Sequence, residues 1–225
     1  MDKATLTLEK LDQFIAQRSI LEHPFYRAWR QGELTRQQLA IYAQVYYPHV
    51  AAFPGYVQAT LQGATDPLVR AKLEENLAEE LGVSKAHPEL WLDFAEGLGM
   101  DWDAVAKTPP HPAAQNAVDT FNHLAHESTP AGLAGLYAYE SQQPQVSRQK
   151  SDGLRLLYAI EDPQTLAYFE VHAEADLRHR QGERLALACC LADGATEAEI
   201  LQAAEQALVG YWGLLDGVCA ESGVE

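Results

Sequence analysis

One stretch of the sequence places three metal-binding residue types at helical spacing. His172, Asp176 and His179 occur in the segment HAEADLRH. At ~100° per residue they share one stripe roughly 60° wide along about 10 Å of helix axis. That length is awkward for one ion but suits two adjacent ions, and imidazole with carboxylate suits iron, manganese or zinc. The spacing therefore indicates a dinuclear metal site; the alternative is a solvated polar helix face.

A second pair of ligand types flanks a predicted helix break. Glu80 ends one helix, Gly82 interrupts it, and His87 begins the next. In one straight helix, residues 80 and 87 would lie ~10 Å apart, whereas the break could fold both side chains towards a common centre. The competing interpretation is a charged outer helix face, with His87 serving as an N-cap before Pro88.

Glu140 is a lone carboxylate at the end of an apolar, small-residue segment, GLAGLYAYE. Such a carboxylate is costly to bury unless it is paired or coordinates a cation; the alternative is exposure at the helix end before Pro144. Three carboxylates and three histidines on three or four helices are the inventory of a carboxylate-bridged dimetal site. The chain has no Glu-x-x-His motif, so the site is not of the ferritin type. The spacing leaves open whether Glu140 or Asp176 bridges the ions.

Helical segments must position these residues. Ala, Leu, Gln and Glu dominate, and β-branched residues show no period-2 alternation. Short connections predict antiparallel neighbours, so we expect one all-α domain over residues 1–225, a bundle of about seven to eight helices. Helix start and stop signals place helices at about 35–61, 66–81, 87–98, 112–127, 130–142, 162–191 and 196–218.

Composition narrows the class of protein. Of 225 residues, 16 are Lys or Arg and 32 are Asp or Glu, which gives a formal charge of −16. This balance argues against a nucleic-acid binder and against docking on an anionic membrane. No apolar stretch approaches a membrane span, and the N-terminal residues do not resemble a signal peptide. Three cysteines make no disulfide framework, so we expect a cytoplasmic protein.

The early segment HPFYRAW, residues 23–29, is followed by Gly32, Leu34 and a helix with Tyr42 and Tyr46. This pattern resembles the haem-oxygenase-like helical family that includes TenA and PqqC. Within it, the chain looks like the branch of CADD-like proteins (proteins associating with death domains) over about residues 10–215. That branch has a Glu and a His seven residues apart, a lone Glu, and then His-x3-Asp-x2-His. The resemblance implies two metal ions, Fe/Fe or Fe/Mn, held by Glu80, His87, Glu140, His172, Asp176 and His179.

The resemblance also implies a function. CADD-like proteins are oxygen-activating enzymes that supply 4-aminobenzoate for folate, with O2 and a reductant as cosubstrates. They are thought to consume one of their own tyrosines, which matches Tyr26, and to take the nitrogen from a lysine, which matches Lys150. Tyr42 and Tyr139 match aromatic positions that line the same site. From the residues alone, Lys150 is either a loop lysine with its head in water or, if buried, a neutral amine.

Other enzymatic interpretations stay open. A dimetal oxidase of the same fold could act on an external small molecule, with Tyr26 and Lys150 only lining the pocket. A cofactor-free PqqC-like oxidase or a TenA-like hydrolase is also conceivable. The hydrolase needs an activated cysteine, and Cys189, Cys190 and Cys219 lie beyond the predicted ligand stripe.

A non-enzymatic interpretation is a protein-interaction module. It would need an exposed apolar stripe, and one side of the helix from Thr196 is apolar, with Ile200, Ala204, Ala207, Leu208 and Tyr211. Packing of this stripe in the core is the simpler explanation. Helical enzymes of this size often bury such a face in a homodimer, so we also expect self-association.

Overall fold

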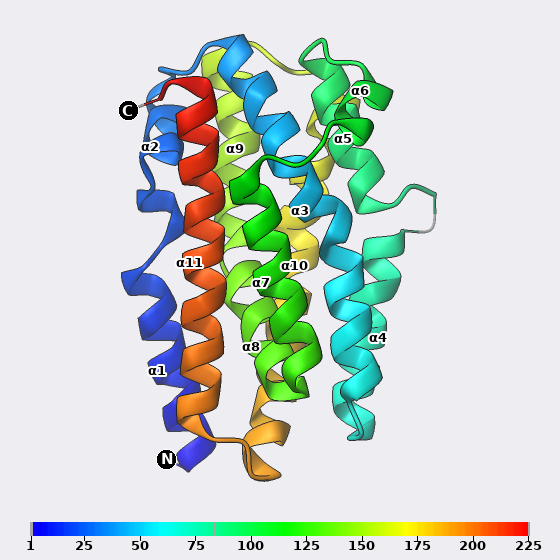
Figure 1. The fold of residues 1–225 in the computed structure, drawn as a ribbon, viewed down its shortest axis with the longest axis vertical. Helices are drawn as coiled ribbons and strands as arrows, with labels where there is room; N and C mark the ends of the chain where they lie inside the picture. The colour runs from blue at the N-terminus through cyan, green and yellow to red at the C-terminus, as the bar shows by residue number, and fades with distance from the viewer. Residues whose placement is uncertain (1, 83, 225) are drawn as a thin grey trace.

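The fold is helical throughout the residues described by the computed structural model, 2–82 and 84–224. These residues form eleven α-helices and one 3-10 turn, η1, in a bundle elongated along the vertical direction of Figure 1. In chain order they are α1 (Lys3–Gln17), η1 (Ile20–Glu22), α2 (Pro24–Gln31), α3 (Arg36–Gly63), α4 (Pro67–Leu81), α5 (His87–Gly97), α6 (Trp102–Lys107), α7 (Pro112–Glu127), α8 (Thr129–Glu140), α9 (Gln143–Tyr158), α10 (Pro163–Ala192) and α11 (Glu197–Ser222).

The all-α prediction is confirmed, but the described chain has more helices than the expected seven to eight. One reason is the boundary between α8 and α9. Pro144 lies in the first turn of α9, where a missing backbone N–H is harmless, so the chain starts a new helix there. Another is α6, a six-residue helix that begins at an Asp101 cap.

The predicted helix starts rest on local capping. The side chain of Thr35 accepts from the backbone N–H of Gln38, and Gln38 bonds back to the backbone of Thr35, which forms the expected capping box of α3. Asp66 and Asp162 cap α4 and α10 with their side chains in the same way. These caps satisfy backbone donors that a helix start leaves without partners, and so fix where the two helices begin.

The long helix α10 organises the bundle. In Figure 1 it runs along the long axis, coloured from yellow to orange. It packs against α4, α5, α8 and α9, which carry the other predicted metal ligands as well as Tyr139 and Lys150. A polar stripe on α10 therefore faces helices that bring carboxylates and imidazoles towards it.

Apolar side chains from most helices form one continuous hydrophobic core. The apolar stripe of α11 is part of it, because its five residues are all buried: Ile200, Ala204, Ala207, Leu208 and Tyr211. The stripe is therefore not an exposed docking face, and the core explanation is confirmed.

The break between α4 and α5 depends on Gly82. Its φ angle of 62° lies in the region that favours glycine. A Cβ at this position would lie 2.0 Å from the carbonyl oxygen of Lys85, so no other residue fits the turn. The turn brings the start of α5 beside the end of α4. No helix of the described residues is long and apolar enough to cross a membrane.

Candidate metal centre

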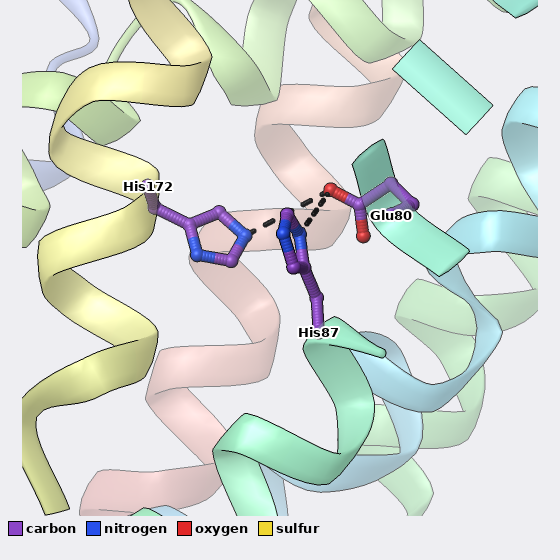
Figure 2. A group of neighbouring side chains, drawn as sticks. All are labelled: Glu80, His87 and His172. Carbon is purple, nitrogen blue, oxygen red and sulfur yellow. Dashed lines mark hydrogen bonds and ion pairs between the residues drawn. The ribbon is translucent and has the colours of Figure 1, made fainter. Parts of the chain in front are cut away.

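The break at Gly82 brings the first group of ligand types together. Nδ1 of His87 lies 2.8 Å from Oε1 of Glu80, and Nε2 of His172 lies 3.8 Å from the same oxygen. Figure 2 shows the three side chains pointing towards one another from α4, α5 and α10. All three are buried, with one ligand atom from each within 4.8 Å of the others. The charged-surface interpretation of Glu80 and His87 is therefore wrong.

His172 is oriented by the backbone of its own helix. Its Nδ1 lies 2.7 Å from the carbonyl oxygen of Tyr168, so Nδ1 carries the hydrogen and donates it. Nε2, on the side facing Glu80, then keeps its lone pair. Burial also holds the pKa of His172 well below its ordinary value, which keeps the ring neutral. A neutral imidazole fixed by a bond from its second nitrogen is the usual form of a metal-binding histidine.

A second group lies about two turns further along α10. His179 places its Nδ1 2.9 Å from Oε1 of Glu140 and 3.2 Å from Oδ1 of Asp176. Glu80, Glu140 and His179 again offer ligand atoms within 4.8 Å of one another. Glu80 thus belongs to both groups. The spacing had left the shared position to Glu140 or Asp176, whereas the structure has Glu80 in both groups.

The buried charges of the second group compensate one another. Burial raises the pKa of Asp176 to about 7. Burial alone would lower the pKa of His179, but its hydrogen bonds to Asp176 and Glu140 raise that pKa to about 11. An imidazolium between carboxylates therefore supplies positive charge at this point.

The residues of both groups fit two adjacent transition-metal ions. Oδ2 of Asp176 is buried without a hydrogen-bond partner in the described structure, whereas Nε2 of His179 lies 3.3 Å from Oε2 of Glu79. Buried polar atoms are normally paired, so such atoms mark a place for a ligand. Imidazole nitrogens with carboxylate oxygens are the donor set of iron and manganese. All six predicted ligand side chains lie together, each at most 5% exposed: Glu80, His87, Glu140, His172, Asp176 and His179.

The other predicted site residues form a separate compartment around Lys150. Its side chain is buried in α9, so the interpretation as a loop lysine with its head in water is wrong. Nζ donates to the hydroxyl of Tyr42 at 2.5 Å and lies 4.4 Å from the centre of the Tyr26 ring. Burial holds the pKa of Lys150 well below its ordinary value. No carboxylate is bonded to it in the described structure, so its burial favours the neutral amine, which faces two tyrosine rings.

Tyrosine hydroxyls connect this compartment with the metal-ligand groups. Tyr26 contacts Tyr42 at 3.4 Å and Tyr211 at 3.5 Å between hydroxyl oxygens. Tyr46 and Tyr139 are hydroxyl partners at 3.1 Å, and the ring of Tyr139 lies 4.8 Å from that of Tyr211. Tyr139 also lines a small cavity beside four of the six ligands, Glu80, Glu140, His172 and Asp176. Tyr139 therefore stands between the two compartments.

Sequence reasoning missed two polar residues at the second group. Nδ2 of Asn76 donates to both oxygens of Glu140, at 3.1 and 3.0 Å, and so orients that carboxylate. Glu183 is 2% exposed and its carboxyl lies beside that of Glu140. Both had a signal in the sequence. Asn76 precedes Glu80 by four residues, and Glu183 follows His179 by four, ~20° from His172 on the same stripe.

The cysteines are not placed for nucleophilic catalysis. Cys189, Cys190 and Cys219 are half-buried near helix ends. Burial raises the pKa of all three thiols, that of Cys190 to about 11. Since an activated cysteine needs a lowered pKa, these observations disfavour the TenA-like hydrolase.

Residues 40–212 match the model of a protein family described as iron-containing redox enzymes. The 4-aminobenzoate synthase of Nitrosomonas europaea is 36% identical over 220 residues, which cover 93% of this chain and 89% of the relative. That of Chlamydia trachomatis is 37% identical over 210 residues, which cover 93% and 90%. Among solved structures, a CADD-like protein from Nostoc punctiforme superposes with a TM-score of 0.80 at 21% identity, over 99% of both chains.

Proposed function

The chain belongs to the haem-oxygenase-like family of iron-containing redox enzymes, and we propose that it is a dimetal oxygenase that makes 4-aminobenzoate. The six clustered carboxylates and imidazoles hold the two ions. Tyr26 supplies the ring of the product, and Lys150 supplies its nitrogen. Two relatives named 4-aminobenzoate synthase, each alignable over 93% of this chain, support the product.

One observation carries the assignment of the two consumed residues. The amine of Lys150 lies 4.4 Å from the centre of the Tyr26 ring, in a compartment closed to solvent. A buried lysine with a lowered pKa is a nucleophile rather than a cation, because its nitrogen keeps its lone pair. Beyond Tyr42 and the aromatic rings around it, Lys150 has no partner in the described structure, and a methionine would fill the same space without a polar atom to bury.

The chemistry of the product fixes which bonds change. In 4-aminobenzoate the carboxyl and amino groups are para, as are Cβ and the hydroxyl on the ring of Tyr26. The Cα–Cβ bond of Tyr26 therefore breaks, and Cβ is oxidised to the carboxyl carbon. The ring C–O bond is replaced by a C–N bond, with the phenol oxygen leaving as water. The Nζ–Cε bond of Lys150 breaks as Cε is oxidised to an aldehyde, and Cα of residue 26 takes up a hydrogen. O2 is the oxidant, and the reductant supplies the remaining electrons.

Each part of the protein has a task in this scheme. Two bound transition-metal ions would supply the activation of O2. Tyr139, which lines the cavity beside the ligands, passes a proton or an electron along the hydroxyls of Tyr46 and Tyr211 towards Tyr26. The hydroxyl of Tyr42 accepts from Lys150 and holds the amine over the ring. The buried compartment leaves room for only about one water molecule beside Tyr26 and Lys150, which limits competition of water with the amine.

The size of the cavities favours an internal substrate. The cavity beside the metal ligands has a volume of about 10 Å³, and so does the one beside Tyr26 and Lys150. Each is large enough for about one water molecule. Pockets for external ligands are typically ~300–1,000 Å³. An aromatic acid entering from outside would not fit, which disfavours the oxidase acting on an external molecule.

Isotope labelling tests the proposal. Protein with ¹⁵N-lysine or with ¹³C-ring tyrosine, loaded with Fe²⁺ and Mn²⁺, is exposed to O2 and a reductant without any added substrate. We expect labelled 4-aminobenzoate at no more than about one equivalent per chain, with the peptides around residues 26 and 150 changed in mass. Unlabelled product, or many equivalents per chain, would show an external substrate instead.

The finer assignments belong to the same proposal. The ions are Fe/Fe or Fe/Mn, since zinc does not activate O2 and carboxylate with imidazole suits both metals. The homodimer and the cytoplasmic location remain predictions from the sequence. Sedimentation equilibrium of the purified chain measures its oligomeric state, and cell fractionation measures its location.

A further inference from the structure

The second ligand group continues into a layer of oxygen atoms without donors. Glu183 extends the α10 stripe one turn past His179, and its side chain is almost completely buried. Its carboxyl lies against the carboxyl of Glu140, and no N–H or hydroxyl donor of the described structure bonds to either of its oxygens. Oδ2 of Asp176 and Oδ1 of Asn76 are also buried without partners. Four oxygen acceptors, all from residues that surround the Glu140 carboxyl, therefore lack a donor.

The neighbouring donors of the described chain are directed elsewhere, and Nε2 of His179 faces Oε2 of Glu79 at 3.3 Å. Nδ1 of His179 donates to Glu140 and Asp176, and Nδ2 of Asn76 donates to both oxygens of Glu140. The stem of Lys72 passes Gly182, but its Nζ pairs with Glu75 at 2.7 Å. A buried carboxylate left unpaired costs several kcal/mol as an isolated ion, roughly the penalty per ion in a protein interior. A cation bound between the adjacent carboxyls of Glu183 and Glu140 would remove this cost.

We infer that Glu183 is a seventh ligand, which completes the second metal site together with Glu140, Asp176 and His179. This rests on the dimetal site of the proposed function. Four carboxylates, those three acids and Glu80, balance the charge of two divalent ions. Six ligands without Glu183 would bury one unit of positive charge, which is unfavourable in a closed core.

The seventh ligand makes the two sites unlike. The first site has two imidazoles, from His87 and His172, and shares Glu80. The second has one imidazole and three carboxylates of its own. Imidazole suits iron, whereas oxygen-rich surroundings suit manganese. Glu183 therefore directs Mn²⁺ to the second site and leaves the first to iron.

Titration of the metal-free protein with Mn²⁺ alone tests the role of Glu183. The six-line electron paramagnetic resonance signal of free Mn²⁺ measures how much remains unbound. We expect Glu183→Gln to bind one of its two Mn²⁺ ions, the one in the site next to Glu183, at least about tenfold more weakly than the unaltered protein. Glu174→Gln, which removes an exposed carboxylate of the same helix, should bind as the unaltered protein does. Two ions bound with unchanged affinity by Glu183→Gln would overturn the inference.

Thermal unfolding separates ligation from a structural role. Without metal, Glu183→Gln should be at least as stable as the unaltered protein, because an unpaired buried carboxyl is replaced by a neutral amide. With Mn²⁺ it should gain less in Tm. A variant that is less stable without metal yet gains as much with Mn²⁺ would contradict ligation. If the glutamine variant does not fold, Glu183→Asp, with a shorter carboxylate, decides by the same titration.

Failure of this inference is distinct from failure of the proposed function. If the unaltered protein forms 4-aminobenzoate and binds two ions, and Glu183→Gln binds both equally well, only the role of Glu183 is wrong. If the unaltered protein binds no pair of ions, both the dimetal function and the seventh ligand are wrong.

Discussion

The side-chain nitrogen of Lys150 lies 4.4 Å from the centre of the Tyr26 ring, and both residues are buried. They come from α9 and α2, more than a hundred residues apart in the sequence. A charged lysine would be costly in this compartment, and burial lowers its pKa accordingly. The pair is therefore an amine and a phenol held in contact, the arrangement that transfer of a nitrogen to the ring requires.

Removing the hydroxyl of Tyr26 tests whether its ring is the substrate. Tyr26→Phe should form no 4-aminobenzoate while it binds the same amount of metal, because the ring can no longer be oxidised at the phenol. Tyr47→Phe, at a half-buried tyrosine outside the compartment, should retain full yield. Product is measured by chromatography after one exposure to O2. Substantial product from Tyr26→Phe would favour an external substrate.

The lowered pKa of Lys150 predicts a pH-dependent stability. In the unfolded chain a lysine has a pKa of about 10.4. At a pH between the lowered pKa of the folded state and this value, Lys150 takes up a proton when the protein unfolds. The cost of burying Lys150 therefore falls as the pH rises from its lowered pKa towards about 10.4. Lys150→Met should have the higher free energy of unfolding near neutral pH, with a gain that shrinks at alkaline pH. Urea titrations from pH 6 to pH 10 measure this, and a gain independent of pH would mean that Lys150 is buried in its charged form.

Tyr139 links the metal ligands to Tyr26 in this scheme. Tyr139→Phe removes the hydroxyl that contacts Tyr46 at 3.1 Å and should slow product formation by about 100-fold, the scale of a lost proton-transfer group. Metal content should not change, because Tyr139 is not among the ligands. Single-turnover kinetics measure the rate. An unchanged rate would show that Tyr26 is oxidised by another route.

Local signals in the sequence were sufficient for the helices and for the ligand stripe. Caps such as Thr35 and Asp162 act within four residues, and the stripe of α10 follows from helical periodicity. Gly82 indicated the turn that brings Glu80 and His87 together, because only glycine tolerates the backbone conformation at this position. These features depend on neighbours along the chain, which is why the sequence alone revealed them.

Features that depend on packing between distant helices were not accessible in this way. Glu79 and Glu80 are adjacent and chemically alike, yet Glu80 is buried while Glu79 is partly exposed and pairs with Arg178. Only the orientation of α4 against α10 distinguishes them. The burial of Lys150 likewise depends on α2 and α3, whose tyrosines surround it, while its own segment is polar. The family resemblance, rather than its local sequence, indicated its role.

The helix α8, which carries Glu140, packs closely against α3. This contact predicts that a larger residue at Gly132 lowers the stability of the fold. A Cβ at Gly132 would lie 2.3 Å from Oγ1 of Thr60, so Gly132→Ala must push the two helices apart. We expect a loss of about 1–3 kcal/mol in the free energy of unfolding, typical of overpacking. Gly213→Ala, in a helix with open space around it, should be neutral or stabilising by about 0.5–1 kcal/mol. Equal effects of the two substitutions in urea titrations would contradict this packing.

Metal content is the most direct test of the central claim that the buried carboxylates and imidazoles form a dinuclear metal centre. Elemental analysis compares protein produced with added iron and manganese with a His172→Ala/Asp176→Ala variant produced in the same way, after circular dichroism shows that both are folded. The account predicts about two transition-metal ions per chain in the unaltered protein and their loss in the variant. Well-folded protein without metal under every loading condition, or the same metal content in both proteins, would contradict it.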